Sequence, residues 1–437
     1  MNSLPQKIKQ KNARVVVIGL GYVGLPLALT IEKSGFAVTG LDTDSKKIAA
    51  LKKGQSYIDD IKNEEVGAAL SRGRFTPTAD TSVIKNADIC IIAVPTPLDA
   101  HKIPNLSPVI SAAQTIAHYA HKNQLVVLES TTYPGTTDEV LLPLIQKALP
   151  KATVGEDFFI AFSPERVDPG NKHFTTATTP KIVGGVTPAC TTHAALFYSQ
   201  FITTVVPVSS AKVAEMTKLL ENIFRIVNIS LVNELALFAD KAGIDIWEVI
   251  SAASTKPYGF MPFYPGPGVG GHCIAVDPFY LSYKAREYGF FTRFIDLAGE
   301  INEMMPHYVV TKIATALNYT LAKAINKSRI LILGVAYKKD IQDTRESAAY
   351  PIVEMLTQKG ARISYYDDYC DSFTTKDGHS LLRLTHLTQK ALNRFDAVVI
   401  LTDHSNVDYT MVAQHAAVVV DTRNVISTRR YKNVYHL

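Results

Sequence analysis

Residues 14–42 read RVVVIGLGYVGLPLALTIEKSGFAVTGLD, and the fold assignment starts from this stretch. Its first run of Val and Ile predicts a strand, the glycines that follow predict a tight turn, and the next apolar spacing predicts a helix. A second β-rich run ends at Asp42. The segment therefore reads as strand, turn, helix and strand, which is the beginning of a parallel α/β domain.

The turn carries the pattern G-x-G-x-x-G, in the context that dinucleotide binding requires. The first glycine allows the tight turn, the second lets the backbone approach a pyrophosphate, and the third lets the helix pack on the strand. Asp42 lies eighteen residues beyond Gly24. An acid there binds ribose hydroxyls and repels a 2′-phosphate, so we expect NAD rather than NADP. The alternative is a glycine-rich turn with Asp42 at a solvated strand end. The predicted loop contacts are Gly19, Gly21, Tyr22, Val23 and Gly24.

Composition excludes several classes of protein. The 437 residues carry a net charge of +5 and are 47% hydrophobic, which is typical of globular proteins and not of disordered ones. No basic stripe indicates a nucleic-acid partner. No apolar run approaches about 18 residues, so we expect no membrane partner. The polar N-terminal segment is unlike a secretory signal, and a cytoplasmic location is expected.

The four cysteines lie far apart, at positions 90, 190, 273 and 370. They form no C-x-x-C pair and have no clustered histidines, so we expect no metal site and no redox dithiol. Cys90 lies in an apolar run and is interpreted as a small core residue. Cys273 lies in a different environment, described below.

The βα rhythm recurs at both ends of the chain and is interrupted by helices in the middle. A helix is predicted over about 210–243, followed by helices at 246–253, 278–288 and 294–321. The expected fold is therefore α/β, then helical, then α/β, with parallel sheets. Predicted strands cover 14–18, 37–41, 88–94, 125–128, 158–162, 203–208, 329–333, 362–366, 396–401 and 416–420.

The long predicted helix carries a polar stripe on an otherwise apolar surface. At 100° per residue, Lys218, Asn222, Arg225 and Asn233 fall within a sector of roughly 80°. Polar side chains in an apolar setting need partners, because unpaired buried charges are costly. The stripe is either a set of ion pairs or caps at a domain junction, or a polar wall that faces a substrate.

Residues 264–273, YPGPGVGGHC, are too rich in Gly and Pro for a helix or a central strand. Such a loop brings backbone amides close to a ligand and leaves Cys273 accessible. A helix is predicted to begin after it, with Asp277 as N-cap and Pro278 at the first position. A thiol near a helix N-terminus tends towards a lowered pKa. The alternative is a structural Cys beside a capping Asp.

Several motifs occur together in a definite order along the chain. They are GLGYVGLPLA, VPTP, FSPERVDPG, KLLENIFRIVNISLVNE, GPGVGGHCIAVDP and GVAYKKDIQDTRES. From about residue 14 onward, the chain resembles the UDP-glucose/UDP-N-acetylhexosamine 6-dehydrogenase family. The stretch STKPYGFMPFYPGPGVGGHC is more similar to the UDP-N-acetylglucosamine branch than to the UDP-glucose branch.

The resemblance implies two Rossmann-like domains joined by a long helix and a helical middle domain. It implies an NAD-binding domain at 1–208, a dimerising domain at 209–325 and a UDP-sugar-binding domain at 326–437. The implied reaction oxidises a sugar C6 hydroxyl to a carboxylate in two hydride transfers, through a cysteine thiohemiacetal and a thioester. The expected product is a uronic acid for a bacterial-type surface polysaccharide.

The resemblance also implies roles for individual residues. Cys273 is the nucleophile, and Lys218, Asn222 and Asp277 surround the reacting C6 oxygen. Glu165 handles the water of thioester hydrolysis, and Thr131 lies in the same site. Implied cofactor contacts are the glycine loop with Asp42, Lys47, Thr96, Thr131 and Arg345. Implied substrate contacts are Glu165, Arg166, Val167, Lys218, Asn222, Tyr264, Gly266, Gly268, Gly270, Lys338, Lys339 and Arg423.

One position departs from the family pattern. UDP-glucose dehydrogenases generally have an Arg from the neighbouring subunit sixteen residues before the cysteine, and Pro257 stands there in this chain. Lys256 is an alternative source of that positive charge. The departure puts the inter-subunit substrate contact in doubt.

Other functions remain open at this stage. UDP-glucose, UDP-N-acetylgalactosamine and UDP-N-acetylmannosamine are alternative substrates. A two-electron hydroxyacid-type dehydrogenase would need neither the cysteine nor a second nucleotide domain. A non-catalytic nucleotide-sugar sensor would tolerate the loss of Cys273, Lys218 or Glu165. Counting the NADH formed per sugar separates the classes of function. A UDP-sugar 6-dehydrogenase forms two, a hydroxyacid-type dehydrogenase forms one, and a sensor forms none.

The variant Cys273→Ala should bind NAD and UDP-sugar but form almost no uronic acid. The change removes the covalent acceptor and leaves the glycine backbone in place, so we expect a loss of roughly a thousandfold or more. Product mass spectrometry and calorimetric binding on the purified variant measure the two properties. Near-normal acid formation with normal binding would exclude the cysteine from the mechanism.

Overall fold

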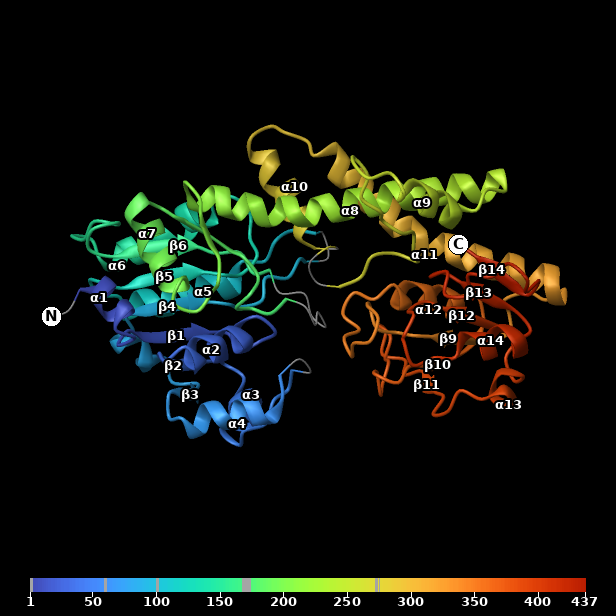
Figure 1. Ribbon diagram of the computed structural model, residues 1–437, viewed down its shortest axis with the longest axis horizontal. Coiled ribbons are helices and arrows are strands. Elements are labelled where there is room, and N and C mark those ends of the chain that lie inside the picture. The colour runs from blue at the N-terminus through green and yellow to red at the C-terminus, as the bar shows by residue number, and fades with distance from the viewer. Residues whose placement is uncertain (1–2, 59–60, 100–101, 167–173, 272–273, 275) are drawn as a thin grey trace. The chain divides into compact units, whose positions relative to one another are not determined.

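The computed structural model describes residues 3–58, 61–99, 102–166, 174–271, 274 and 276–437. The chain forms two compact units, residues 1–221 with 279–290 and residues 222–278 with 291–437. Each unit is built on its own sheet (Figure 1). Residues 272, 273 and 167 are outside the described part of the chain, so the predictions for Cys273 and Val167 are not addressed by the coordinates.

The first unit contains an eight-stranded sheet in the order β3-β2-β1-β4-β5-β6-β7-β8. All neighbouring strands are parallel except β6 and β7. The strands are β1 (Arg14–Ile18), β2 (Ala37–Leu41), β3 (Phe75–Thr78), β4 (Ile89–Ile92), β5 (Leu125–Leu128), β6 (Phe159–Phe162), β7 (Lys181–Gly185) and β8 (Val205–Pro207). The helices are α1 (Leu4–Lys9), α2 (Gly24–Lys33), α3 (Ser45–Lys52), α4 (Asn63–Ser71), η1 (Thr81–Asn86), α5 (Ser107–His118), η2 (Thr137–Leu141), α6 (Leu142–Ala148) and α7 (Pro188–Tyr198).

Both faces of this sheet are buried. Along β4, Ile89 and Ile91 belong to one apolar cluster, whereas Cys90 and Ile92 belong to another. Because successive side chains of a strand point to opposite faces, two clusters sharing one strand mean that helices cover both sides. This explains why the central strands are continuous apolar runs. Cys90 is fully buried, which confirms its interpretation as a core residue.

The second unit contains a six-stranded parallel sheet in the order β11-β10-β9-β12-β13-β14. This order is the same as that of the first six strands of the other sheet, and it is the doubly wound Rossmann order. The strands are β9 (Arg329–Leu333), β10 (Arg362–Tyr366), β11 (Leu382–Arg383), β12 (Ala397–Ile400), β13 (Val419–Asp421) and β14 (Val434–His436). The helices are α9 (Ile246–Ala253), α11 (Arg293–Leu321), α12 (Ala349–Gln358), α13 (Gln389–Leu392) and α14 (Tyr409–His415).

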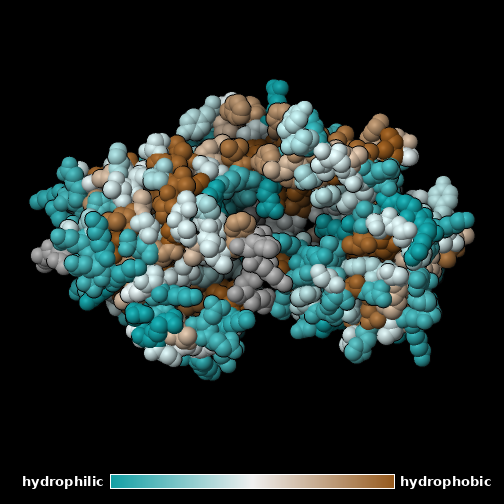
Figure 2. Space-filling model, viewed as in Figure 1, coloured by the Kyte–Doolittle hydropathy of each residue, from teal (hydrophilic) through white to brown (hydrophobic). Residues whose placement is uncertain are grey.

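Two further helices have residues in both units. They are α8 (Ala211–Ala242) and α10 (Asp277–Glu287). By length and composition α8 could cross a membrane, but core helices of soluble proteins pass the same test, so this is weak evidence. Apolar residues reach the surface in the upper part of Figure 2, across which Figure 1 draws α8. The expectation that the chain has no membrane partner stays a prediction.

The expected α/β class, with two Rossmann-like parallel sheets and a helical middle, is confirmed. Strands β3, β7, β11 and β14 were missed. β3 contains Pro77, which suits its place at the sheet edge, and β7 ends in two glycines. Pro and Gly weaken the strand signal, so pairing with neighbours decides these segments.

Candidate active site

The glycine loop after β1 has the geometry that the sequence pattern predicted. Gly19 has a φ of +93°, and a Cβ there would lie 2.5 Å from the carbonyl oxygen of Ala93. A Cβ on Gly24 would lie 1.8 Å from the carbonyl oxygen of Gly19, whereas one on Gly21 would meet nothing within 4 Å. Side chains are therefore excluded where loop, helix and strand pack together, and open space lies beside the second glycine. This arrangement fits a dinucleotide pyrophosphate.

Asp42 follows β2 and holds the glycine loop. Its Oδ2 accepts a hydrogen bond from the backbone N–H of Leu20 at 2.8 Å, and Lys47 Nζ lies 3.7 Å from the same oxygen. Tyr57 donates its hydroxyl to the Leu20 carbonyl at 2.7 Å. Burial, with Asp42 and Asp44 nearby, raises the pKa of Tyr57, so its hydroxyl keeps the proton. Asp42 and Lys47 therefore lie together beside the loop.

Two further predicted cofactor residues, Thr96 and Thr131, follow β4 and β5. Thr96 is buried, and its carbonyl accepts the Tyr280 hydroxyl at 2.7 Å. β1 and β4 are neighbours although β2 and β3 intervene in sequence. The segment after β4, which carries Thr96, therefore lies at the point where strand order reverses. Ligands of open α/β sheets bind outside the carboxyl ends of the strands at this point.

The segment that follows Thr131 is anchored by a carboxylate from α8. Glu215 is fully buried and accepts hydrogen bonds from the backbone N–H groups of Gly135 at 2.6 Å and Thr137 at 2.9 Å. The Thr137 hydroxyl donates to the same carboxylate at 2.7 Å. Burial outweighs these hydrogen bonds and raises the pKa of Glu215 to about 7. The contacts tie the Thr131 segment to the helix that carries Lys218.

Lys218 and Glu165 lie together in the first unit, as the sequence predicted. Lys218 is buried, and its Nζ donates to the backbone carbonyl of Glu165 at 2.7 Å. The Glu165 carboxylate accepts the backbone N–H of Arg166 at 2.7 Å. The Arg166 guanidinium is paired with Glu221 of α8 and also donates to the carbonyl of Pro180 at 2.7 Å. The segment that carries Glu165 and Arg166 is therefore fixed to α8 at two points.

In the second unit, Asn222 and Asp277 form a buried pair. The Asn222 amide donates to Asp277 Oδ2 at 2.5 Å, and each residue is less than a tenth exposed. The helix α10 begins at Asp277, one residue earlier than predicted. Asn233 is also buried, and its Oδ1 accepts the backbone N–H of Gly266 at 2.9 Å. Arg225 is exposed, unlike the three other residues of the polar stripe, and its place in a wall that faces a substrate stays a prediction.

The glycine loop at 264–271 packs against the second sheet's loops. A Cβ on Gly266 would lie 2.9 Å from Arg423 Nη1, and one on Gly270 would lie 2.5 Å from the carbonyl oxygen of Glu346. The Gly271 N–H donates to the carbonyl of Arg345 at 3.2 Å. Gly266 is thus placed beside Arg423, which is expected to bind substrate, and Gly270 lies against the backbone of Glu346, next to the expected cofactor contact Arg345. A side chain on either glycine would block this approach.

Of the other predicted residues of this unit, Tyr264 is exposed and stacks on Trp247, and Gly268 has a φ of +128°. Lys256 lies 5.3 Å from the ring centroid of Tyr258. Both Lys256 and Pro257 are exposed. The expectation that Lys256 replaces the missing inter-subunit Arg stays a prediction.

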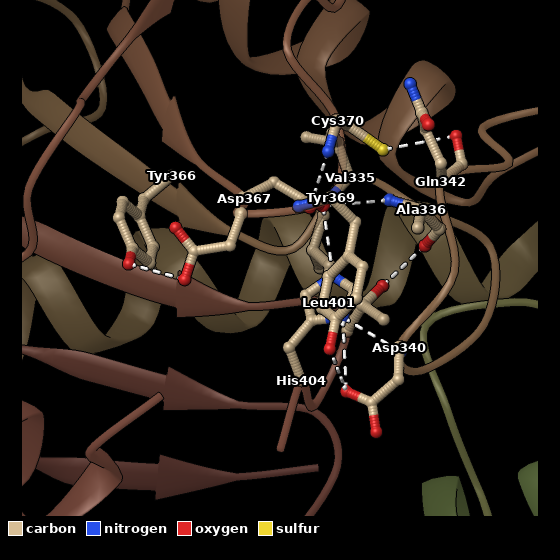
Figure 3. A network of polar contacts seen from close by, with 12 residues as sticks. Val335, Ala336, Asp340, Gln342, Tyr366, Asp367, Tyr369, Cys370, Leu401 and His404 are labelled. Carbon is tan, nitrogen blue, oxygen red and sulfur yellow. Dashed lines mark hydrogen bonds and ion pairs between the residues drawn. The ribbon is translucent and has the colours of Figure 1, made fainter. Parts of the chain in front are cut away.

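Lys338 and Lys339 lie on the loop that follows β9. Lys339 Nζ is 3.8 Å from Asp403, and Arg345 is paired with Asp343 at 2.6 Å. The loop is held by His404, a buried residue on the loop that follows β12 (Figure 3). The backbone N–H of Asp340 donates to Nδ1 of His404 at 3.0 Å, so Nε2 carries the proton that faces Asp367 Oδ2 at 3.0 Å.

Asp367 connects the loop after β10 to the loop after β9. Its Oδ2 accepts the backbone N–H groups of Val335 at 2.8 Å and Ala336 at 3.3 Å. Burial acts to raise the pKa of Asp367, but the hydrogen bonds from His404 and from the backbone outweigh it and lower that pKa. A fully bonded buried network of this kind fixes the path of the loop that carries Lys338 and Lys339.

Sequence reasoning missed the residues that support the site. Lys181, Glu215, Asp367 and His404 are buried, and each contacts a segment that carries a predicted site residue. Glu129 is buried two residues before Thr131 and pairs with Lys181. A local signal existed for two of them, because Glu129 ends and Lys181 begins an apolar run that is otherwise free of charge. The partners are far apart in sequence, so the pairs themselves carry no sequence signal.

A Rossmann sheet with a glycine loop after its first strand and an acid after its second strand defines a dinucleotide-dependent enzyme. Residues 13–202 match the NAD binding domain of the UDP-glucose/GDP-mannose dehydrogenase family. Residues 212–304 match the central domain of that family, and residues 331–428 match its UDP binding domain. The chain belongs to this family and is an NAD-dependent UDP-sugar dehydrogenase.

The chain is similar to named proteins over nearly its whole length. It is 36% identical over 423 residues to Protein CapL of Staphylococcus aureus, covering 95% of this chain and 97% of that protein. It is 34% identical to the UDP-N-acetyl-D-glucosamine 6-dehydrogenase of Pseudomonas aeruginosa, covering 90% and 91%. A structure of UDP-D-ManNAc dehydrogenase from Pyrococcus horikoshii aligns with a TM-score of 0.86 at 32% identity, covering 97% and 98%.

Replacing Glu215 with Gln should change how stability depends on pH. The pKa of Glu215 is raised in the folded protein from 4.5 to about 7, so its contribution is complete below pH 4.5 and is lost as the pH rises through 7. The raised pKa corresponds to a loss on the order of 3 kcal/mol in the free energy of unfolding as the pH increases. Gln cannot accept the Gly135 N–H at its amide nitrogen, so Glu215→Gln should be less stable than wild type at pH 5.

The same comparison at higher pH gives the test. The difference in unfolding free energy between wild type and Glu215→Gln should shrink towards zero, or reverse, between pH 5 and pH 8. Urea unfolding of both proteins across this range measures it. Parallel pH dependences would show that Glu215 does not titrate in this range.

Proposed function

We propose that the chain oxidises the C6 hydroxyl of a UDP-N-acetylhexosamine to the carboxylate, with UDP-N-acetylglucosamine as the first choice of substrate. The observation that carries this proposal is the buried Asn222–Asp277 pair, in which Asp277 directly follows the Cys273 loop in sequence. Lys218 is four residues before Asn222 on α8 and is itself buried. An amide, a carboxylate and an ammonium group are what a reacting alcohol needs for orientation, proton removal and charge stabilisation.

In the first oxidation, the C6 hydroxyl must lose a proton while a hydride leaves the same carbon. We assign the proton transfer to Lys218 and Asp277 together, and Asn222 orients the Asp277 carboxylate through its hydrogen bond. The Lys218 charge also stabilises negative charge that develops on the oxygen. NAD, when bound, accepts the hydride in each of the two oxidations.

The second oxidation requires a covalent step. An aldehyde is a poor hydride donor, so the Cys273 thiolate adds to its carbonyl carbon and forms a thiohemiacetal, which is oxidised to a thioester. Water then releases the acid, and Glu165 is the proposed base. Lys218 lies against the Glu165 backbone, which supports a role for the two residues in one reaction.

The remaining assignments follow the same division of the chain. We propose residues 1–208 for NAD, 209–325 for dimerisation and 326–437 for the UDP-sugar. Proposed cofactor contacts are Gly19, Gly21, Tyr22, Val23, Gly24, Asp42, Lys47, Thr96, Thr131 and Arg345. Proposed substrate contacts, besides Glu165, Lys218 and Asn222, are Arg166, Val167, Tyr264, Gly266, Gly268, Gly270, Lys338, Lys339 and Arg423. A cytoplasmic location and a role in surface-polysaccharide synthesis stay predictions.

The names of similar proteins support an N-acetylhexosamine but divide between epimers. The Pseudomonas aeruginosa protein is named for UDP-N-acetyl-D-glucosamine, and the Pyrococcus horikoshii structure for UDP-D-ManNAc. UDP-N-acetylmannosamine is therefore the second candidate substrate. The sequence resemblance of the loop at 254–273 to the glucosamine branch is the reason for the order of preference.

A panel of UDP-sugars assayed by NADH absorbance tests substrate and cofactor together. We expect two NADH per sugar and the highest kcat/KM for UDP-N-acetylglucosamine, with UDP-glucose below the N-acetylhexosamines. With NADP in place of NAD, turnover should fall at least about tenfold, because Asp42 repels a 2′-phosphate. A preference for UDP-glucose would refute the substrate class, and equal turnover with NADP would refute the role of Asp42.

We also propose that α8 forms a homodimer interface. Large apolar side chains are exposed along it at the spacing of one helical face, with a period of about 3.6 residues. A stripe of this length is unusual on a monomer surface. The exposed residues are Val213, Met216, Leu220, Phe224, Leu231, Leu235 and Phe238.

Replacing Leu231 with Glu should convert a dimer to monomers. A carboxylate in an apolar interface would lose its hydration without gaining a partner. Leu382→Glu is the matched control, because Leu382 is also an exposed leucine but lies on β11. Light scattering after size-exclusion chromatography measures the mass. Wild type that is monomeric at micromolar concentration would contradict the proposal.

A further inference from the structure

A lysine that no catalytic role yet includes lies between two carboxylates in the first unit. The Lys181 Nζ is 2.7 Å from Glu129 Oε2 and 3.8 Å from Glu165 Oε2. The Tyr198 hydroxyl donates to the other oxygen of Glu129. The side chains of Lys181 and Glu129 are at most 5% exposed, and that of Glu165 is 11% exposed. Glu165 therefore shares its cation with a second, deeper carboxylate.

Sheet topology explains how the three residues meet. Glu129 follows β5 and Glu165 lies three residues beyond β6, so both are at the carboxyl edge of parallel strands. β7 runs antiparallel to β6, with Phe162 opposite Gly184. Continuing this register past the end of β6 sets Lys181 opposite Glu165. The antiparallel pairing of β6 with β7 thus brings the start of β7 to the edge where strands β1 to β6 end.

The charges in this cluster do not balance if both carboxylates are ionised. Burial acts to lower the pKa of Lys181, but the negative charges of Glu129 and Glu165 outweigh it and raise that pKa, so the ammonium stays charged. The pKa of Tyr198 is raised well above its usual value by burial, so its hydroxyl keeps the proton that it donates to Glu129. Burial and the nearby charge of Glu165 raise the pKa of Glu129, although Lys181 opposes this rise. Glu129 is therefore the carboxylate of the two that more readily takes a proton, which leaves the charge of Lys181 to Glu165.

We propose that Lys181 is a positioning residue for Glu165, which it keeps ionised and aligned for thioester hydrolysis, with Glu129 and Tyr198 fixing the ammonium in place. This inference rests on the proposed function of Glu165. In the step concerned, one proton of water passes to Glu165, the remaining hydroxide bonds to the thioester carbon, and the C–S bond breaks. The sugar leaves as the carboxylic acid and Cys273 as the thiolate, without oxidation or reduction.

Other groups also surround Glu165, and their arrangement leaves this role to Lys181. Lys218 contacts its backbone carbonyl, and the Arg166 guanidinium is paired with Glu221. Among the described residues, Lys181 is the lysine or arginine that comes within ion-pair distance of the Glu165 carboxylate. Within the described part of the chain, the charged or titratable groups around Glu165 include Lys181, Glu129, Lys218, Arg166, Glu221 and Tyr198.

Two substitutions should move the pH dependence of hydrolysis in opposite directions. In Lys181→Met the two carboxylates face each other without a cation. The acidic limb of the pH profile, where the rate of thioester hydrolysis falls as Glu165 is protonated, should therefore move to higher pH by about 1 pH unit. In Glu129→Gln the lysine has one carboxylate left, so the limb should move to lower pH. Lys181→Arg should restore the wild-type limb, because it restores the charge.

The experiment measures hydrolysis apart from oxidation. Purified enzyme is mixed with UDP-N-acetylglucosamine and NAD, quenched at intervals, and the covalent sugar adduct is quantified by intact-protein mass spectrometry across pH 5.5–9. Lys181→Met should accumulate the thioester near pH 7 after a normal burst of NADH. The double variant Lys181→Met/Glu129→Gln removes both charges of the buried pair and so leaves no uncompensated charge to oppose folding. The acidic limb of its pH profile should lie between those of the two single variants.

The outcomes separate the inference from the function on which it rests. If both single variants shift the limb in the same direction, or neither shifts it, Lys181 does no more than neutralise Glu129 and the inference is overturned. If Glu165→Gln hydrolyses the thioester at the wild-type rate, or no adduct forms in any variant, the proposed function itself fails. Opposite shifts with rescue by Lys181→Arg would support the inference, since loss of fold cannot produce both directions.

Discussion

One close approach of backbone to backbone recurs in both sheets, and the candidate site depends on it. A glycine with positive φ follows the first strand of each Rossmann order, Gly19 after β1 and Gly334 after β9. A side-chain carbon at either position would lie 2.5 Å from a carbonyl oxygen after the neighbouring strand, that of Ala93 or of Thr402. The chain can therefore turn directly across the end of that strand. Loops that are distant in sequence then meet at the carboxyl edge of each sheet.

The acid that follows the second strand shows how one topology serves two purposes. Asp42 in the first unit and Asp367 in the second unit each accept a backbone N–H from the loop after the first strand. Asp42 retains partial exposure beside Lys47, which suits contact with a ribose. Asp367 is fully buried and bonded to His404, so its carboxylate fixes a loop and is closed to a ligand. The same position is thus a candidate ribose contact in one unit and a support in the other.

Buried charge is concentrated around the predicted catalytic residues. Lys218, Glu215 and the Lys181–Glu129 pair are almost fully buried in the first unit, and Asp277 is buried in the second. Burying each of these groups removes its hydration, a cost that burial of an apolar residue does not carry. A hydrogen bond or an opposite charge offsets this cost for each group. Because a partner removed from such a pair leaves an uncompensated charge, these contacts hold the reacting groups in fixed positions.

The sequence by itself determined the properties that depend on short spacing. The glycine loop at 19–24, the acid at Asp42, the long helix and the Rossmann class are written in neighbouring residues, because turns, helices and strands follow local sterics and periodicity. The ordered motifs also determined the family. Spacing placed Lys218, Asn222 and Asn233 on one face of a helix, and all three are buried there.

Tertiary structure alone decided what depends on pairing between distant segments. The two sheets share one strand order although the sequences of the two halves are not obviously alike, because many apolar runs satisfy the same alternation. Arg225 shares the helical sector of Lys218 but is exposed, since periodicity does not say where a packed neighbour ends. The reversal of β7 brings Lys181 to Glu165, and no spacing within the chain encodes that contact. Strand direction is set by which backbone edges meet, and those edges are separated in sequence by other elements of the fold.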